Sequence, residues 1–396
     1  MSKNIKNDRL RRSEEIFCGN IRWLLYSDIT IKTGPDRGAM YGWKNLNPTS
    51  YPFIYNEIVG YSITAFSWIY SELGQVAALD AAKAASHWII ENIKRYGNLL
   101  PVGRKEVSSF SQKVDLSNLI YAFDNGMIMI GLLNLHKLTE DPRFLNYAEA
   151  IAKAIIERFY EGSRMGAVVY RNLKPMVSNK DKEIKWSMIP GAYHAKLALG
   201  LLELADLTGE DLYRKVSCSI CNSLKTWQRP DGRFITNPDT AITYLHPHLY
   251  ACEGLIFSGL KDRKRNYLTM GLNGLKWAIK TMLSNGGVLP RSTIEKNVDQ
   301  SDCISQLLRL LILCRQQLVE ETDCLEQSLL DKVIEKLHLR LLDFCIPSGC
   351  DKGAMKYRIR MASACSWCTM FSMQALGLWN RRRKGYENMT WINFYI

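Results

Sequence analysis

Residues 191–234 limit the possible folds more than any other stretch, because they contain a complete helical hairpin. Residues 192–207 are apolar on nearly every side, and such a helix is normally buried all round. The segment that follows the turn at 207–211 is amphipathic. Its apolar residues recur at every fourth position, namely Leu212, Val216, Ile220 and Leu224. The repeating unit is therefore an inner helix paired with an outer helix.

This unit repeats along the chain. The predicted inner helices are 57–73, 124–138, 192–207, 247–260, 300–318 and 362–379, and the outer ones are 77–96, 143–160, 212–225, 265–283 and 324–344. The amphipathic helix 8–26 has no partner in sequence, and neither does 362–379. Packing these two together closes a ring. We therefore predict an all-α, single-domain (α/α)6 toroid over residues 1–396, in which 380–396 form a basic C-terminal tail.

The connections of the predicted hairpins alternate in length. Turns from an inner to an outer helix are short, whereas loops from an outer to the next inner helix are long. All long loops therefore emerge at one end of the ring, where the inner helices begin. We call this end the mouth. Functional residues concentrate on loops that a rigid scaffold holds, so we expect the site there. Glycines within the inner helices, among them Gly200 and Gly254, are expected to permit close packing.

Eleven cysteines are scattered along the chain without paired zinc knuckles. Cys218/Cys221 and Cys365/Cys368 have CxxC spacing, but both pairs fall inside predicted helices, whereas zinc sites usually place at least one pair on a turn. We expect small core side chains and a reducing compartment. The sequence contains no P-loop and no strand followed by GxGxxG, so no nucleotide cofactor is expected, and no metal either.

The formal net charge is +13, with a basic cluster at 381–384. A solvated basic surface and an anionic ligand both fit this charge. Nucleic acid is not expected, because the basic residues are dispersed and no known binding motif is present. The first 15 residues lack the apolar core of a secretory signal, which predicts a cytoplasmic protein. Residues 361–379 are uncharged, but they coincide with an inner helix, so no membrane span is expected. Nothing indicates the oligomeric state.

Six hairpins closed by an N-terminal helix resemble the (α/α)6 toroid of the six-hairpin glycosidase superfamily. The turns Leu138-Thr-Glu-Asp-Pro-Arg-Phe144 and Leu207-Thr-Gly-Glu-Asp-Leu-Tyr213 look like the inner-to-outer turns of those proteins. Residues 51–61, Tyr-Pro-Phe-Ile-Tyr-Asn-Glu-Ile-Val-Gly-Tyr, are similar to proteins encoded in bacterial polysaccharide-biosynthesis clusters. The superfamily includes hydrolases, polysaccharide lyases and sugar epimerases, so the resemblance alone does not choose a reaction.

Two carboxylates are the first catalytic candidates. Glu57 and Asp124 open the first and second inner helices, where helix capping alone would also favour acidic residues. Glycoside hydrolysis needs one acid and one base or nucleophile, and adjacent helices are close enough for the two to act together. The resemblance implies the same positions, because unsaturated glucuronyl hydrolases use acidic residues at comparable hairpins. We expect Asp124 to be the more buried member and the acid.

Histidine and tyrosine residues gather at the third and fourth predicted inner helices. Tyr193 and His194 lie at the third, and His246 and His248 at the fourth. Such side chains can remove and return a proton next to a uronate carboxylate, which is lyase or epimerase chemistry. We list His194 and His248 as catalytic candidates on this ground.

Further residues are expected to bind substrate. Arginines in the long loops could clamp a carboxylate or phosphate, and aromatic rings could stack on sugars. These candidates are Trp43, Tyr61, Trp186, Tyr193, His246, Arg291, Asp302, Arg358 and Trp367.

Together these patterns predict a carbohydrate-active protein of polysaccharide metabolism that hydrolyses an anionic saccharide through a carboxylate pair at the mouth. Two alternatives stay open. One is a uronate lyase or sugar epimerase that uses tyrosine and histidine. The other is a non-catalytic module that binds a glycan or an assembly partner.

Overall fold

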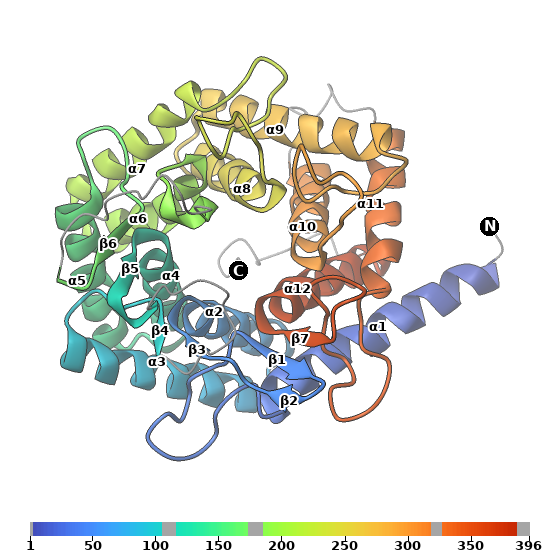
Figure 1. The fold of residues 1–396 in the computed structure, drawn as a ribbon, viewed down its shortest axis with the longest axis horizontal. Helices are drawn as coiled ribbons and strands as arrows, with labels where there is room; N and C mark the ends of the chain where they lie inside the picture. Colours follow the sequence, from blue (N-terminus) through green and yellow to red (C-terminus); the bar gives the residue numbers. More distant parts are fainter. Residues whose placement is uncertain (1–2, 105–115, 173–184, 318–326, 386–396) are drawn as a thin grey trace.

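The computed structural model describes residues 3–104, 116–172, 185–317 and 327–385, and within these ranges it confirms the predicted ring of helices (Figure 1). The inner helices are α2 (Asn56–Leu73), α4 (Ala122–Thr139), α6 (Ala195–Thr208), α8 (Leu245–Lys261), α10 (Ser301–Gln317) and α12 (Ser366–Arg383). The outer helices are α1 (Lys3–Tyr26), α3 (Val76–Tyr96), α5 (Pro142–Phe159), α7 (Asp211–Ser223), α9 (Arg265–Ser284) and α11 (Gln327–Leu342).

The two kinds of helix differ in burial as their sequences predict. On the inner helix α4 an unbroken run, from Ala122 to Met129, is buried. The outer helix α5 buries one stripe only, which consists of Phe144, Ala148, Ile151, Ala152, Ile155 and Phe159. Asp141 caps this helix, because its side chain accepts a hydrogen bond from the Arg143 backbone. One apolar core extends from Ile16 to Trp379.

The N-terminal helix α1 closes the ring against the end of the chain. It packs along α12, and its Asn20 side chain donates a hydrogen bond of 2.5 Å to the Gly353 carbonyl. Trp23 donates to the Asp351 carboxylate at 3.0 Å. Asp351 also pairs with Lys44 at 2.9 Å, so the loop after α1 is tied to the loop before α12.

Short antiparallel strands cover the mouth, and the sequence did not predict them. β1 (Trp43–Leu46) lies between β2 (Thr49–Ser50) and β7 (Ser363–Cys365), β3 (Ile54–Tyr55) pairs with β4 (Gly103–Arg104), and β5 (Leu119–Tyr121) pairs with β6 (Val168–Tyr170). In β1–β7 pairing, Trp43 lies opposite Cys365. β3, β5 and β7 run directly into α2, α4 and α12, and so fix where these inner helices begin. Short 3-10 helices occupy Leu116–Asn118, Trp186–Met188, Ala192–His194 and Leu224–Thr226.

Glycine permits the close approach of the inner helices, as the sequence suggested. A Cβ added at Gly254 of α8 would lie 2.2 Å from the Ala195 carbonyl carbon, which is backbone of α6. At Gly200 the nearest atom would be the tip of the Met129 side chain, at 2.3 Å. The two helices can therefore touch at Gly254 only because that residue lacks a side chain.

Some expectations need correction or remain outside the described residues. The predicted tail 380–396 begins inside α12, which continues to Arg383, and residues 386–396 lie outside the described ranges. Cys365 belongs to β7 and not to a helix. The cysteines within the described ranges are free thiols. Among the described helices, none combines the length and apolar character needed to cross a membrane.

Candidate active site

Two carboxyl groups meet at the mouth. Glu57 lies in the first turn of α2 and Asp124 in the first turn of α4. These neighbouring helices pack closely, and the charge on Glu57 acts directly on Asp124. Asp124 is 2% exposed and its Oδ2 makes no hydrogen bond to the described residues, whereas Glu57 is only half-buried. The pair that the sequence predicted is therefore brought together, with Asp124 the more buried member.

Both groups hold their protons more tightly than exposed carboxyls do. Burial, together with the Glu57 charge, raises the pKa of Asp124 well above its usual range. Burial also raises the pKa of Glu57, to about 7, although hydrogen bonds from Tyr55 and Tyr61 and the charge of Lys196 act against this rise. Both carboxyls are consequently easier to protonate than exposed ones, and Glu57 is close to its titration midpoint at neutral pH.

A pair of tyrosines lies below Glu57. The hydroxyls of Tyr61 on α2 and Tyr250 on α8 are 2.7 Å apart. Tyr61 also hydrogen-bonds the Glu57 carboxyl, and either tyrosine hydroxyl can be the donor to the other. Both rings are buried, which leaves Tyr61 in the floor of the site instead of on its surface.

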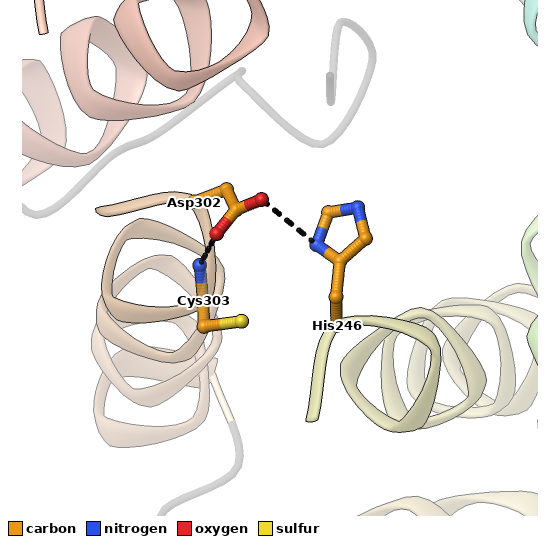
Figure 2. Close-up of side chains that lie close together, drawn as sticks. All are labelled: His246, Asp302 and Cys303. Atoms are coloured by element: carbon orange, nitrogen blue, oxygen red, sulfur yellow. Dashed lines mark hydrogen bonds and ion pairs between the residues drawn. The ribbon is translucent and has the colours of Figure 1, made fainter. Parts of the chain in front are cut away.

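His246 and Asp302 form a second polar group, at the starts of α8 and α10 (Figure 2). His246 Nδ1 is 2.7 Å from Gln306 Oε1 and 3.6 Å from Asp302 Oδ2. Asp302 also accepts hydrogen bonds from Trp367 Nε1, at 3.2 Å, and from the Cys303 backbone, at 2.7 Å. Burial lowers the pKa of His246, so its ring is neutral. Figure 2 shows Nε2 directed away from Asp302.

His246, Asp302 and Cys303 have the right donor types for a transition metal, and their ligand atoms all lie within 4.8 Å of one another. The hydrogen bonds argue against such a role. His246 Nδ1, the nitrogen that faces Asp302, already bonds Gln306, and Asp302 accepts two donors. Burial and the Asp302 charge raise the pKa of the Cys303 thiol well above its usual range, which disfavours the thiolate that a metal needs. The group is better described as a hydrogen-bonded cluster that orients His246.

The other two histidine candidates lie deeper in the protein. His248 accepts a hydrogen bond from the Phe234 backbone at Nδ1 and donates to the Gly274 carbonyl from Nε2, so the backbone occupies both of its nitrogens. His194 is buried, and its Nε2 has no hydrogen-bond partner within the described ranges. Burial lowers the pKa of His194 to about 3 and that of His248 to about 4. The structure therefore does not bring either of them into the His246 cluster.

Aromatic side chains surround the two polar groups. Trp186 packs edge-on against Tyr193, with ring centroids 5.0 Å apart, and lies 5.8 Å from the His246 ring. Trp367 and Trp43 meet at 6.4 Å on the other side. The three tryptophans are half-buried and keep part of their surface free for stacking, whereas Tyr193 is buried.

The two arginine candidates differ in their partners. Arg291 forms an ion pair with Glu295 and lies over the Tyr244 ring. Arg358 lies over the Tyr357 ring, and its Nε makes no hydrogen bond to the described part of the chain. Arg358 is thus the better placed of the two to bind an anion.

Sequence reasoning missed a buried charge cluster below the tyrosines. Lys196 Nζ lies 3.0 Å from Glu253 Oε1, and Arg309 Nη2 lies 4.0 Å from Glu253 Oε2. A signal was present in the sequence, because each of these three residues interrupts an otherwise apolar inner helix.

Two surface cavities, of about 640 and 680 Å³, lie on the outer helices around α7 and α9. Neither cavity includes any residue of the carboxylate pair, the His246 group or the buried charge cluster.

Neither a family model nor a curated protein matches the sequence. Several solved structures are similar over nearly the whole chain. Cellobiose 2-epimerase from Bacillus thermoamylovorans B4167 has a TM-score of 0.70 at 14% identity, covering 92% of this chain and 98% of that one. Unsaturated glucuronyl hydrolase from Bacillus sp. GL1 has a TM-score of 0.65 at 12% identity, covering 96% and 98%. The corresponding hydrolase from Streptococcus agalactiae has a TM-score of 0.69 at 11% identity, covering 97% and 94%. This chain therefore has the (α/α)6 toroid fold, as the sequence resemblance implied.

Proposed function

We propose that this protein hydrolyses a glycosidic bond in an anionic saccharide, with Asp124 as general acid and Glu57 as general base. The observation that carries the proposal is the interacting pair itself. Two carboxyls from adjacent inner helices differ in burial, and the pKa of the more buried one, Asp124, is raised well above its usual range, while that of Glu57 is raised to about 7. Environments that separate the pKa values of two neighbouring carboxyls are typical of acid–base pairs in glycosidases.

The reaction would proceed by direct displacement. Asp124 gives its proton to the glycosidic oxygen as the bond from that oxygen to the anomeric carbon breaks. A water molecule attacks this carbon, and Glu57 takes the proton that the water loses. The proton from Asp124 leaves with the departing sugar, Glu57 carries the proton taken from the water, and exchange with solvent restores both groups.

An anionic substrate is supported by charge near the pair and over the molecule. The chain carries a net charge of +13. The charge of Lys185 acts on Asp124, and Arg358 has a guanidinium nitrogen without a hydrogen-bond partner among the described residues. Unsaturated glucuronyl hydrolases, which share the fold, act on acidic sugars by name. A role in polysaccharide metabolism agrees with the resemblance of residues 51–61.

The test is turnover by Asp124→Asn. We expect the variant to keep its fold and its saccharide binding, and to lose turnover by about two to four orders of magnitude, the usual scale for acid–base catalysis. The substrates to assay are oligosaccharides ending in saturated or unsaturated uronate, compared with neutral cellobiose. Full turnover by Asp124→Asn would contradict the assignment, and equal turnover of neutral sugars would contradict the anionic substrate.

A second candidate, sugar epimerisation, is favoured by the geometry of His246. Its Nδ1 is held by Gln306 and lies next to Asp302, so Nε2 is the nitrogen available to take a proton. A base oriented in this way can remove a proton next to a carbonyl and return it on the other face. Cellobiose 2-epimerase shares the fold.

Solvent isotope incorporation separates the two candidates. Epimerisation through His246 would place deuterium from D2O on a sugar carbon and would be lost in His246→Ala. With a saturated substrate, hydrolysis through Asp124 puts no deuterium on carbon, and His246→Ala would retain bond cleavage.

A further inference from the structure

The interior of the ring contains three charged side chains from three successive inner helices: Lys196 of α6, Glu253 of α8 and Arg309 of α10. Their side chains are 2%, 0% and 0% exposed. The ammonium lies 3.0 Å from one Glu253 oxygen and the guanidinium 4.0 Å from the other. Arg309 also donates a hydrogen bond to Gln374 at 2.7 Å. Buried charges are stable only when they are paired, so the sign balance of this cluster matters.

Two cations and one anion give this cluster a net charge of +1. The Tyr61 and Tyr250 side chains lie between this charge and Glu57. Lys196 Nζ lies 5.1 Å from the Tyr61 ring centroid and 4.6 Å from that of Tyr250. The hydroxyls of these two rings are the ones that bond each other and lead to Glu57. The positive end of the cluster therefore lies directly below one member of the carboxylate pair.

Lys196 faces charged or titratable groups from three helices. They are Glu57 and Tyr61 of α2, His246, Tyr250 and Glu253 of α8, and Arg309 of α10. Asp124 interacts instead with the charge of Lys185. Each carboxyl of the pair therefore has its own nearby cation, and for Glu57 that cation is the fully buried Lys196.

We propose that Lys196 is a positioning residue that holds Glu57 as the ionised member of the pair, and thereby decides which carboxyl is base and which is acid. This inference rests on the proposed function of the pair. Glu253 serves to keep the ammonium charged inside the ring, against the opposing charge of Arg309, and the Tyr61–Tyr250 bridge keeps it from direct contact with substrate.

The experiment measures where Glu57 titrates in the folded protein. Free energies of unfolding are determined from pH 4 to 9 for wild type, Glu57→Gln, Lys196→Met and the double variant. The difference between each protein and its Glu57→Gln counterpart gives the midpoint of Glu57. With Lys196→Met this midpoint should rise by about 1 pH unit or more, the usual size of the effect of one nearby opposite charge. An unmoved midpoint would overturn the proposal.

Lys137→Met is the matched control. Lys137 is also largely buried, and its ammonium lies 2.9 Å from the Glu203 carboxylate. It belongs to the last turn of α4, whereas Asp124 belongs to the first turn of the same helix. Its removal should destabilise the protein and leave the Glu57 midpoint in place. If Lys196→Met does not fold, Glu57→Gln alone still tests the coupling. The interaction is reciprocal, so Glu57→Gln must lower the pKa of Lys196, which is about 8 in the wild type. An unchanged pKa of Lys196 would refute the coupling between the two residues.

These readouts need no substrate, so they separate this inference from the proposed function. A shifted midpoint in a protein that hydrolyses no saccharide would sustain the role of Lys196 and remove the hydrolase assignment. Where turnover is found, the acidic limb of its pH profile should move with the midpoint in Lys196→Met and stay in place in Lys137→Met. If Lys196→Met turns over substrate with an unmoved acidic limb, the hydrolase assignment stands and the proposed role of Lys196 is wrong.

Discussion

Glu57 shows how a single side chain can weaken the fold that holds it. Its pKa is raised from the ordinary value of 4.5 to about 7, mainly by burial. A carboxyl with a raised pKa contributes stability below pH 4.5, and that contribution is lost as the pH rises through 7. We expect Glu57→Gln to remove this loss. At pH 8 the variant should be more stable than wild type by about 1 to 3 kcal/mol, and at pH 4 the two should be nearly equal.

Urea unfolding at a series of pH values checks this expectation. Glu15→Gln provides the control, because Glu15 is an exposed surface residue paired with Arg11. Its stability curve should run parallel to that of wild type. A Glu57→Gln protein that is less stable than wild type at pH 8 would mean that the ionised carboxylate helps to hold the fold.

For single residues, the sequence predicted where the candidates lie in the fold but not which groups they contact. Glu57 and Asp124 were identifiable because each opens an inner helix, and adjacent helices must bring such residues together. The bonds of His248 were not predictable, since its partners Phe234 and Gly274 belong to segments before and after its own helix. Lys196 meets its ion partner only once the inner helices stand side by side.

At the scale of helices and strands, periodicity was sufficient for the helices and insufficient for the strands. An inner helix that is apolar all round and an outer one with a single stripe leave clear patterns over some four or five turns. The strands at the mouth are two to four residues long, and most pair with a segment far along the chain, as β1 does with β7. A segment this short does not complete enough alternation to be recognised.

The contact between α6 and α8 gives a prediction at this scale. Gly254→Ala would press a methyl group against the Ala195 backbone, which cannot move without shifting the whole helix. We expect a loss of about 2 to 4 kcal/mol of unfolding free energy, somewhat above the usual cost of overpacking. Gly200→Ala is the comparison, because there the methyl group meets side chains alone, the flexible end of Met129 and the Ile130 side chain, and no backbone. Chemical denaturation should rank Gly254→Ala well below Gly200→Ala, and an equal ranking would contradict the rigid contact.

Over the whole molecule, the ring depends on the junction between its two ends. Lys44 and Asp351 form an ion pair with side chains 11% and 8% exposed. Burial tends to raise the pKa of Asp351, but hydrogen bonds from Lys44 and Trp23 outweigh it and lower the pKa. The stability from this group is therefore present above the ordinary value of 3.8 and is lost as the pH falls below it.

Asp351→Ala should consequently destabilise the protein by about 3 kcal/mol at pH 7, since it leaves a buried lysine without its partner. The difference from wild type should shrink near pH 3. Circular dichroism and tryptophan fluorescence should still report one transition with a common midpoint, because we infer a single cooperative domain. Separate midpoints would indicate that α1 detaches before the rest of the ring unfolds.

The same junction governs the order of events during synthesis. Asn20 and its partner Gly353 are 333 positions apart. At the usual pace of translation, about 5 to 20 residues per second, α1 is made about 15 to 70 seconds before the segment around Gly353 that it contacts. Its apolar stripe, which includes Ile16, Ile21 and Leu24, is meanwhile without its native cover. Helix α1 can therefore complete its packing only after the segment around Gly353 has been synthesised, so the junction is one of the last parts of the ring to form.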